Sequence, residues 1–279
     1  MCSSPQLNFP INNINLEEEQ QLEPPRKIIR HTKSFSTKYI KTSRIKGNGG
    51  FSRITVIKNK KNDILYAFKE KIREQEYDIL KNLKKYIHSN ILSTIDLYKT
   101  TFFGTSIYSA VFPLCEMDLF DCIDKKLLPN ELKNYISQLL DGLEFLHKHK
   151  IAHQDIKPEN ILVNQSKLLY TDFGLSVKCL NNQATTNCGT RQYAPPEINS
   201  DGIPWNPFIG DIFSLGVTIY VMSYKQLIPM KNIEQIKIPI ILPNIISPQK
   251  NLLIYMLAEQ PNLRYTIQQL RKLPYFGTQ

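Results

Sequence analysis

Residues His153–Asn160 read His-Gln-Asp-Ile-Lys-Pro-Glu-Asn, and the rest of the chain can be interpreted outward from them. This short polar stretch holds a carboxylate, a lysine and an amide close together. Asp155 can accept the proton of an attacking hydroxyl, and Lys157 can neutralise charge on a phosphoryl group in transfer. The side-chain oxygen of Asn160 suits a hard cation such as Mg²⁺. The stretch therefore fits phosphoryl transfer, although by itself it would more often be a polar connection after a helix.

Two further segments supply groups that the same reaction needs. Asp172 adds a second carboxylate directly after an apolar run, and Lys69 ends the strand-like segment Tyr66–Lys69. With these segments the sequence resembles the eukaryotic protein kinases. His153–Asn160 resembles their H-R-D-x-x-x-x-N catalytic loop, and Asp172-Phe173-Gly174 is their D-F-G motif. The resemblance implies an α+β, bilobal fold, with a small antiparallel β-sheet and one αC helix in the N-lobe and a larger, mainly α-helical C-lobe.

The resemblance covers residues 38–276, with the N-lobe over about 38–113 and the C-lobe over about 116–276. Residues 1–37 contain several prolines, many Asn and Gln residues, the acidic run Glu17–Glu19 and then a basic cluster, without a persistent helical or strand period. Such a segment cannot bury enough apolar surface to order itself, so we expect a disordered N-terminal tail. Its basic cluster could be a docking or nuclear-import element, or a solvated run of charge.

The composition of the 279-residue chain indicates a soluble intracellular protein. Its formal net charge of +10 comes from scattered basic residues, which favours a solvated surface over a specific nucleic-acid site. The five cysteines form no C-x-x-C pair and no zinc-like spacing with histidine, as in reduced thiols. No apolar signal-peptide core is present, and the longest apolar run, Ile212–Met222, is too short to span a bilayer. We expect a monomer in the cytoplasm, the nucleus or both, with protein substrates and no membrane partner.

The start of the kinase-like region has the pattern of three short antiparallel strands, at Ile40–Ile45, Ser52–Lys58 and Ile64–Lys69. The first turn, Gly47-Asn48-Gly49-Gly50-Phe51-Ser52, resembles the glycine-rich loop of the kinases, with Ser52 in place of the last glycine. Glycines let backbone N–H groups approach phosphate oxygens closely. The resemblance therefore implies that this turn binds the phosphates of ATP.

A helix is predicted over Arg73–Ile87, because leucine and isoleucine recur there at three- and four-residue steps. Glu76 lies on the same face. By resemblance to the αC helix, Glu76 would pair with Lys69 and hold that lysine on the α- and β-phosphates of ATP. Two alternatives stay open. Glu74 could be the partner of Lys69 instead, or Glu76 could be an exposed carboxylate on the helix surface.

The run Ile107–Leu114 has the pattern of a buried strand, and the resemblance makes Phe112–Asp118 the hinge between the lobes. The resemblance makes Phe112 the bulky residue at the back of the adenine pocket, and Cys115 the source of a backbone N–H for the adenine. Asp118 would face the ribose hydroxyls, although a solvated carboxylate fits nearly as well. The side chains implied to pack above and below the adenine ring are Ile54, Ala67 and Leu162. Ordinary core packing explains Leu162 equally well.

Between Asn130 and Lys150, apolar residues trace one helical stripe, with Asn130 as the N-cap. A buried helix is therefore expected to lead into the catalytic loop. Further on, Gly189–Glu197 resembles the G-T-x-x-Y-x-A-P-E end of the kinase activation segment. The resemblance implies that Thr190 reaches the catalytic aspartate and lysine.

Two longer-range contacts are also implied by the resemblance. Glu197 would pair with Arg264, which occupies the matching place before the last helix. Asp211 begins the segment that matches the central helix of the kinases, and its carboxylate would brace the catalytic loop from below.

The implied activity is transfer of the γ-phosphoryl group of ATP, bound with Mg²⁺, to protein serine or threonine hydroxyls. Lys157 is the serine/threonine-type feature. The implied catalytic residues are Asp155, Lys157, Lys69, Glu76 and Thr190, and the implied metal ligands are Asn160 and Asp172. The segments Asp118–Phe120 and Lys157–Asn160 look somewhat like calmodulin-kinase or checkpoint-kinase relatives.

Gln154 is the most informative departure, because many kinases have there an arginine that pairs with a phosphorylated activation loop. Without that cation, a phosphate on Thr185 or Thr186 would lose its main partner. We therefore expect activity without activation-loop phosphorylation. The main alternative is a pseudokinase scaffold, whose usual sign is loss of a lysine or aspartate that this chain retains. A small-molecule kinase is disfavoured by Gly189–Glu197, which resembles a peptide-binding platform.

Overall fold

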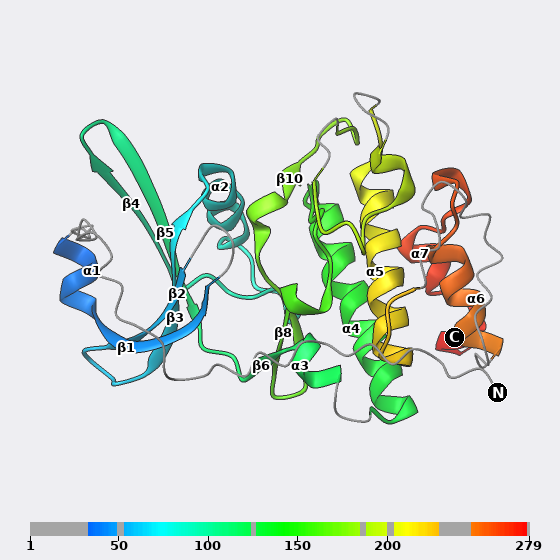
Figure 1. The fold of residues 1–279 in the computed structure, drawn as a ribbon, viewed down its shortest axis with the longest axis horizontal. Coiled ribbons are helices and arrows are strands. Elements are labelled where there is room, and N and C mark those ends of the chain that lie inside the picture. Colours follow the sequence, from blue (N-terminus) through cyan, green and yellow to red (C-terminus); the bar gives the residue numbers. More distant parts are fainter. Residues whose placement is uncertain are drawn as a thin grey trace, which may run out of the picture.

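The structure is a computed structural model that describes residues 33–48, 53–123, 127–184, 188–199, 204–228 and 247–277. Figure 1 shows two lobes, a smaller one built around a sheet and a larger one built mainly from helices. The expected α+β, bilobal fold is therefore confirmed. The polypeptide crosses from one lobe to the other directly after the last strand of the small lobe.

The small lobe contains a five-stranded antiparallel sheet in the order β1-β2-β3-β5-β4. Its strands are β1 (Tyr39–Asn48), β2 (Arg53–Asn59), β3 (Leu65–Ile72), β4 (Asp96–Phe102) and β5 (Thr105–Pro113). The first three correspond to the predicted strands with shifted ends, and β4 was not predicted. β3 lies between β2 and β5, so the backbone that carries Lys69 is hydrogen-bonded on both sides.

Helix α2 (Glu74–Leu83) covers the sheet on the side that faces the large lobe (Figure 1). It buries Ile79, Leu80 and Leu83 as predicted. The prediction that the helix continues to Ile87 is wrong, because the chain turns after Leu83 and Ile87 is 97% exposed. The spacing of Ile87 fits the helical pattern of apolar residues, but its side chain is not part of the core.

A short helix, α1 (Lys33–Lys38), packs on the outer face of the same sheet. Phe35 is buried there, with its ring centroid 4.6 Å from that of Phe68 and 5.2 Å from that of Tyr98. Lys38 Nζ lies 2.6 Å from a carboxylate oxygen of Asp96. The prediction of disorder is therefore wrong for residues 33–37, because the sheet supplies the apolar partners. Residues 1–32 of the expected tail lie outside the described residues.

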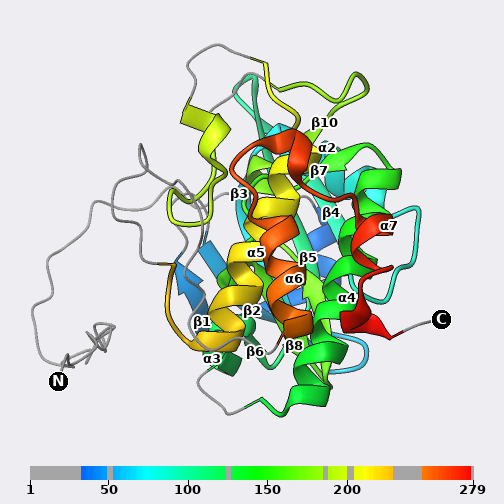
Figure 2. The same ribbon diagram turned by 90° about the vertical axis from the view of Figure 1, so that its right-hand side faces the viewer.

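The large lobe is organised around α4 (Pro129–Lys148) and α5 (Pro207–Tyr224). α5 contacts both α4 and α6 (Ser247–Met256), as Figure 2 shows. The smaller elements of this lobe are β6 (Met117–Asp118), α3 (Leu119–Ile123), β7 (Ile151–Ala152), β8 (Ile161–Asn164), β9 (Lys167–Tyr170), β10 (Val177–Lys178) and α7 (Ile267–Leu270). Among the described residues, single 3₁₀ turns lie at Pro158–Asn160, Phe173–Leu175, Pro196–Asn199, Pro261–Leu263 and Pro274–Phe276.

The start of α4 differs by a short distance from the prediction. Leu128, not Asn130, is the N-cap residue, and Pro129 occupies the first helical position. Proline fits there because its fixed φ suits the helix and its missing N–H would have no partner in the first turn. Glu131 accepts a hydrogen bond from the backbone N–H of Leu128 at 2.8 Å, which closes the helix end without an asparagine cap.

Among the described helices, α5 is the one that is long and apolar enough to cross a membrane by length and composition. However, 78% of its apolar window is buried inside the structure. Residues on every side of α5 are buried, including its polar Asp211, Ser214 and Thr218. This burial is that of a core helix, onto which the catalytic loop packs.

Candidate active site

The catalytic loop is held from below by the carboxylate of Asp211 on α5. Its Oδ2 accepts a hydrogen bond from the backbone N–H of His153 at 2.8 Å, and its Oδ1 accepts one from that of Gln154 at 2.8 Å. His147 Nε2 on α4 lies 3.0 Å from the same Oδ2. The carboxylate is fully buried, so these partners replace the water that it has lost. The contact expected between Asp211 and the loop is present.

The backbone of the loop is bent at Gln154, whose φ of 64° lies in the left-handed region. The activation segment comes close to this bend at Gly189, whose φ is 101°. A Cβ atom at Gly189 would lie 2.5 Å from the carbonyl oxygen of Gln154, so only glycine fits there. Beside it, Cys188 Sγ lies 3.2 Å from Gln154 Oε1. The activation segment and the catalytic loop are thus in direct contact.

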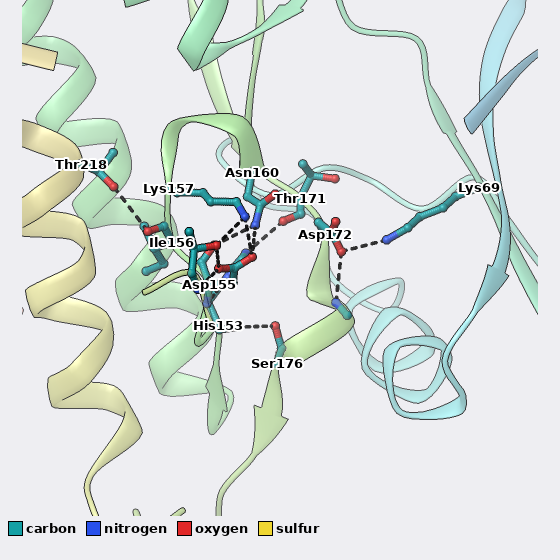
Figure 3. A network of polar contacts seen from close by, with 12 residues as sticks. Lys69, His153, Asp155, Ile156, Lys157, Asn160, Thr171, Asp172, Ser176 and Thr218 are labelled. Carbon is teal, nitrogen blue, oxygen red and sulfur yellow. Dashed lines mark hydrogen bonds and ion pairs between the residues drawn. The ribbon is translucent and has the colours of Figure 1, made fainter. Parts of the chain in front are cut away.

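Asp155 lies at the centre of a cluster of polar side chains (Figure 3). Its Oδ1 accepts hydrogen bonds from Thr190 Oγ1 at 2.7 Å and from the Thr190 backbone N–H at 2.9 Å. Its Oδ2 accepts one from Asn160 Nδ2 at 2.8 Å and lies 3.1 Å from Lys157 Nζ. Lys157 also donates to Thr190 Oγ1 at 2.7 Å. The structure therefore brings three of the predicted residues, Thr190, Asn160 and Lys157, around the carboxylate of the fourth, Asp155.

Lys69 on β3 bridges two carboxylates. Its Nζ lies 2.7 Å from Glu76 Oε1 on α2 and 2.8 Å from Asp172 Oδ1. Burial by itself would lower the pKa of Lys69, but the negative charges of Glu76 and Asp172 raise it above its ordinary value. The lysine therefore stays charged. Glu74, the alternative partner, is hydrogen-bonded instead to the hydroxyl of Tyr108 on β5.

Asp172 and Asn160 offer oxygen atoms that suit Mg²⁺. Burial would raise the pKa of Asp172, but Lys69 and the backbone N–H of Gly174 lower it, so the carboxylate stays ionised. The amide nitrogen of Asn160 donates to Asp155, which leaves the amide oxygen as its cation ligand. No group of three His, Cys, Asp or Glu side chains gathers as a metal site within the described ranges. Asp172 and Asn160 are thus the residues of this site that could hold Mg²⁺.

The predicted phosphate-binding turn is described only in part. Gly47 and Asn48 end β1, where they pair with Ile54 and Arg53 of β2. Gly49, Gly50, Phe51 and Ser52 lie outside the described residues. Ile54 pairs in turn with Lys69 on β3, so these two residues lie on the same face of the sheet.

The predicted adenine contacts come from both lobes. Phe112 is buried and pairs with Ala67, which precedes Lys69 by one full strand period, so all three lie on one face of the sheet. On the large lobe, Leu162 is half-buried and pairs with Asp118. Cys115 is buried, and in the sequence it lies between β5 of the small lobe and β6 of the large lobe.

Asp118 has a contact that was not predicted. Its Oδ1 accepts a hydrogen bond from the backbone N–H of Asp121 at 2.8 Å, so it stabilises the first turn of α3. The sequence contained a signal for this role, since aspartate is a preferred residue immediately before a helix.

The activation segment is anchored at its far end to the last part of the chain. Arg264 donates to both carboxylate oxygens of Glu197, at 2.6 and 2.7 Å. The pair expected between these residues is therefore present. Arg264 also donates to the carbonyl oxygens of Ala258 and Glu259, at 2.7 and 3.0 Å.

Several contacts at the site were missed because they have no local sequence signal. Gln75 and Arg73, in or beside the first turn of α2, donate to the carbonyl oxygens of Ser176 and Gly174 at 2.5 and 3.5 Å. The contact between Cys188 and Gln154 is another. Each joins segments that are far apart in the chain, so no spacing rule could find them.

Comparisons with known proteins agree with this geometry. The family described as "Protein kinase domain" matches residues 40–276. The SNF1-like protein kinase ssp2 of Schizosaccharomyces pombe is 31% identical, over 73% of this chain and 36% of that protein. The SNF1-related protein kinase catalytic subunit alpha KIN12 of Arabidopsis thaliana is 31% identical, over 83% of this chain and 50% of that protein. An Aurora kinase of S. pombe is 29% identical, over 82% of this chain and 69% of that protein. This chain therefore spans about a third to a half of the SNF1-type relatives' length.

Proposed function

Since the chain belongs to the eukaryotic protein kinase family, we propose that it transfers the γ-phosphoryl group of ATP to serine or threonine hydroxyls of proteins. One observation supports this most directly. Lys69 is paired with both Glu76 and Asp172, while Asp155 is held by Lys157, Thr190 and Asn160. These two sets of contacts are the ones that phosphoryl transfer would need, and their presence together supports the proposal.

In the proposed reaction, Asp155 orients the substrate hydroxyl and accepts its proton. Lys157 neutralises charge on the phosphoryl group as it is transferred. Thr190 holds Lys157 and Asp155 in position through its hydroxyl group. Lys69, oriented by Glu76, holds the α- and β-phosphates. Mg²⁺ held by Asn160 and Asp172 would supply further neutralisation of phosphate charge. The protein acts mainly by positioning and electrostatic stabilisation.

We further propose that activity does not require phosphorylation of Thr185 or Thr186, which lie outside the described residues. Gln154 has no charge with which to bind a phosphate. Its amide oxygen is instead close to Cys188, directly before the glycine that contacts the catalytic loop. Contacts made by Cys188 and Thr190 support an activation segment that is held in place without a phosphate. We also propose a monomeric protein in the cytoplasm, the nucleus or both.

The test is transfer of labelled γ-phosphate from ATP with Mg²⁺ to a serine, threonine and tyrosine peptide library. The protein is expressed in a host without eukaryotic protein kinases and compared with Asp155→Asn, which keeps the shape of the side chain. Asp63→Asn, in an exposed turn, is the matched control. Transfer to serine or threonine that is lost only in Asp155→Asn supports the proposal. No transfer despite ATP binding would favour a pseudokinase.

A further inference from the structure

The first turn of α2 is hydrogen-bonded to the segment that follows the D-F-G motif. Gln75 Nε2 donates to the carbonyl oxygen of Ser176 at 2.5 Å. Arg73, directly before the helix, donates to the carbonyl oxygen of Gly174 at 3.5 Å. The N-terminal part of α2 is therefore attached to the start of the activation segment as well as to its own sheet.

Ser176 is itself hydrogen-bonded to the catalytic loop (Figure 3). Its side chain is completely buried, and its Oγ donates to the carbonyl oxygen of His153 at 3.0 Å. Its backbone N–H donates to the carbonyl oxygen of Phe173 at 3.1 Å, which fixes its own position in the 3₁₀ turn. The backbone N–H of His153 is in turn bound by Asp211. A continuous series of hydrogen bonds thus runs from Gln75 through Ser176 to the catalytic loop.

The first turn of α2 depends on such contacts from outside the helix. Within the described residues, Arg73 at the N-cap makes no side-chain hydrogen bond that would cap the helix. Backbone N–H groups of a first turn have no partners inside the helix, so an uncapped turn frays easily. Glu74 ties one side of this turn to Tyr108 on β5, and Gln75 ties another side to Ser176. Together with the pair of Glu76 and Lys69, these contacts hold the turn between the sheet and the segment after the D-F-G motif.

Gln75 is directly followed by Glu76, whose carboxylate holds Lys69 at 2.7 Å. Because both residues belong to one helical turn, a displacement of Gln75 moves Glu76 with it. A shift of about 1 Å is enough to weaken a hydrogen bond of this length substantially. On the basis of the proposed function, we propose that Gln75 is a positioning residue. Through Ser176 it couples α2 to the catalytic loop and so keeps Glu76 on Lys69.

The first test replaces Gln75 with methionine, which keeps the length of the side chain but removes its donor. Loss of one hydrogen bond predicts a fall in kcat/KM for ATP of roughly two- to tenfold, with the KM for the peptide unchanged. Gln75→Lys retains a donor and should recover part of the loss. Lys81→Met, on an exposed position of the same helix, is the control and should behave as wild type. An unchanged kcat/KM in Gln75→Met would contradict the role.

A double substitution separates positioning from general damage to the fold. If Gln75 acts through Glu76, then adding Gln75→Met to Glu76→Gln should cause no further loss of activity. Losses that multiply would show that Gln75 acts in another way and would overturn the inference.

Amide hydrogen exchange gives a readout that does not need activity. The amides of α2 should exchange faster in Gln75→Met than in wild type, with an unchanged Tm for the whole protein. Equal exchange rates would refute the role of Gln75. A wild-type protein without phosphotransfer would instead count against the proposed function, and the exchange data would still test the coupling.

Discussion

Glu197 and Arg264 form a two-point ion pair, with nitrogen–oxygen distances of 2.6 and 2.7 Å, between the end of the activation segment and the turn before α7. The Arg264 side chain is completely buried, and that of Glu197 is 15% exposed. Removing one partner of such a pair leaves the other charge buried without compensation. The pair therefore holds the activation segment against the large lobe.

Arg264→Ala should lower the free energy of unfolding by about 3–5 kcal/mol, because Glu197 would keep a buried charge without its partner. Urea unfolding at neutral pH measures this loss. Arg271→Ala is the matched control, since Arg271 pairs with Asp141 at the surface. A pair of that kind contributes no more than about 1 kcal/mol. Equal losses in the two variants would contradict the structural role of Glu197 and Arg264.

Thr190→Val should lower kcat by roughly ten- to a hundredfold. The substitution keeps the shape of the side chain but removes the hydroxyl that joins Asp155 to Lys157. Hydrogen bonds to charged groups contribute about 1.5–3 kcal/mol, and each 1.4 kcal/mol corresponds to a factor of ten. Steady-state kinetics with a peptide substrate measure the effect. Thr190→Ser should retain most of the activity, and Thr101→Val on the exposed side of β4 should retain all of it.

Glu76→Gln and Asp172→Asn should change stability with opposite dependence on pH. Burial raises the pKa of Glu76 above its ordinary value of 4.5, although Lys69 opposes the shift. Its contribution to stability is therefore complete below pH 4.5 and is lost as the pH rises through the pKa in the folded protein. Relative to wild type, Glu76→Gln should become more stable as the pH rises through that range.

For Asp172, burial would raise the pKa, but Lys69 lowers it below the ordinary value of 3.8. Its contribution is present above pH 3.8 and is lost as the pH falls through the pKa in the folded protein. Asp172→Asn should therefore be less stable than wild type at neutral pH, and the difference should shrink in acid. Urea unfolding across a pH series measures both variants. If the stability difference from wild type changed with pH in the same direction for both variants, the pKa direction given for Glu76 or for Asp172 would be wrong.

Thr185→Ala/Thr186→Ala should keep kcat within about twofold of wild type, as for substitutions that remove no essential contact. The physical reason is that Gln154 carries no charge to bind a phosphate. The measurement uses protein whose lack of phosphate has been checked by mass spectrometry. Gln154→Arg is the informative companion, because it supplies the missing cation and should make the rate sensitive to phosphate on these threonines. A tenfold fall in the alanine variant would refute independence from phosphorylation.

The local pattern of the sequence was sufficient for most elements that carry the site. Strands β2 and β3, helix α4 and the catalytic loop were predicted because period, polarity and turn residues are properties of neighbouring residues. The resemblance then identified Asp155, Lys157 and Asn160 as a group. The structure places Lys157 and Asn160 beside the carboxylate of Asp155.

Choices between neighbouring residues needed the tertiary structure. Glu74 and Glu76 stand in the same turn of α2, and the sequence left both open as the partner of Lys69. Packing of the helix decides between them, because it directs Glu76 toward Lys69 and Glu74 toward Tyr108. The end of α2 was predicted too late for a related reason, since the spacing of Ile87 fits the helix although the core does not include it.

By itself, the sequence determined the order of the motifs, because each motif is a short-range pattern. The resemblance of these ordered motifs to the protein kinases then implied the fold class and the residues that carry the proposed chemistry. Only the tertiary structure decided that Phe35 folds onto the sheet and that Gln75 reaches Ser176. These contacts join residues whose partners lie far away in the chain, and a single aromatic or amide side chain has no periodic signature. Their energies arise only when the two surfaces meet, so no inspection of either segment alone could have found them.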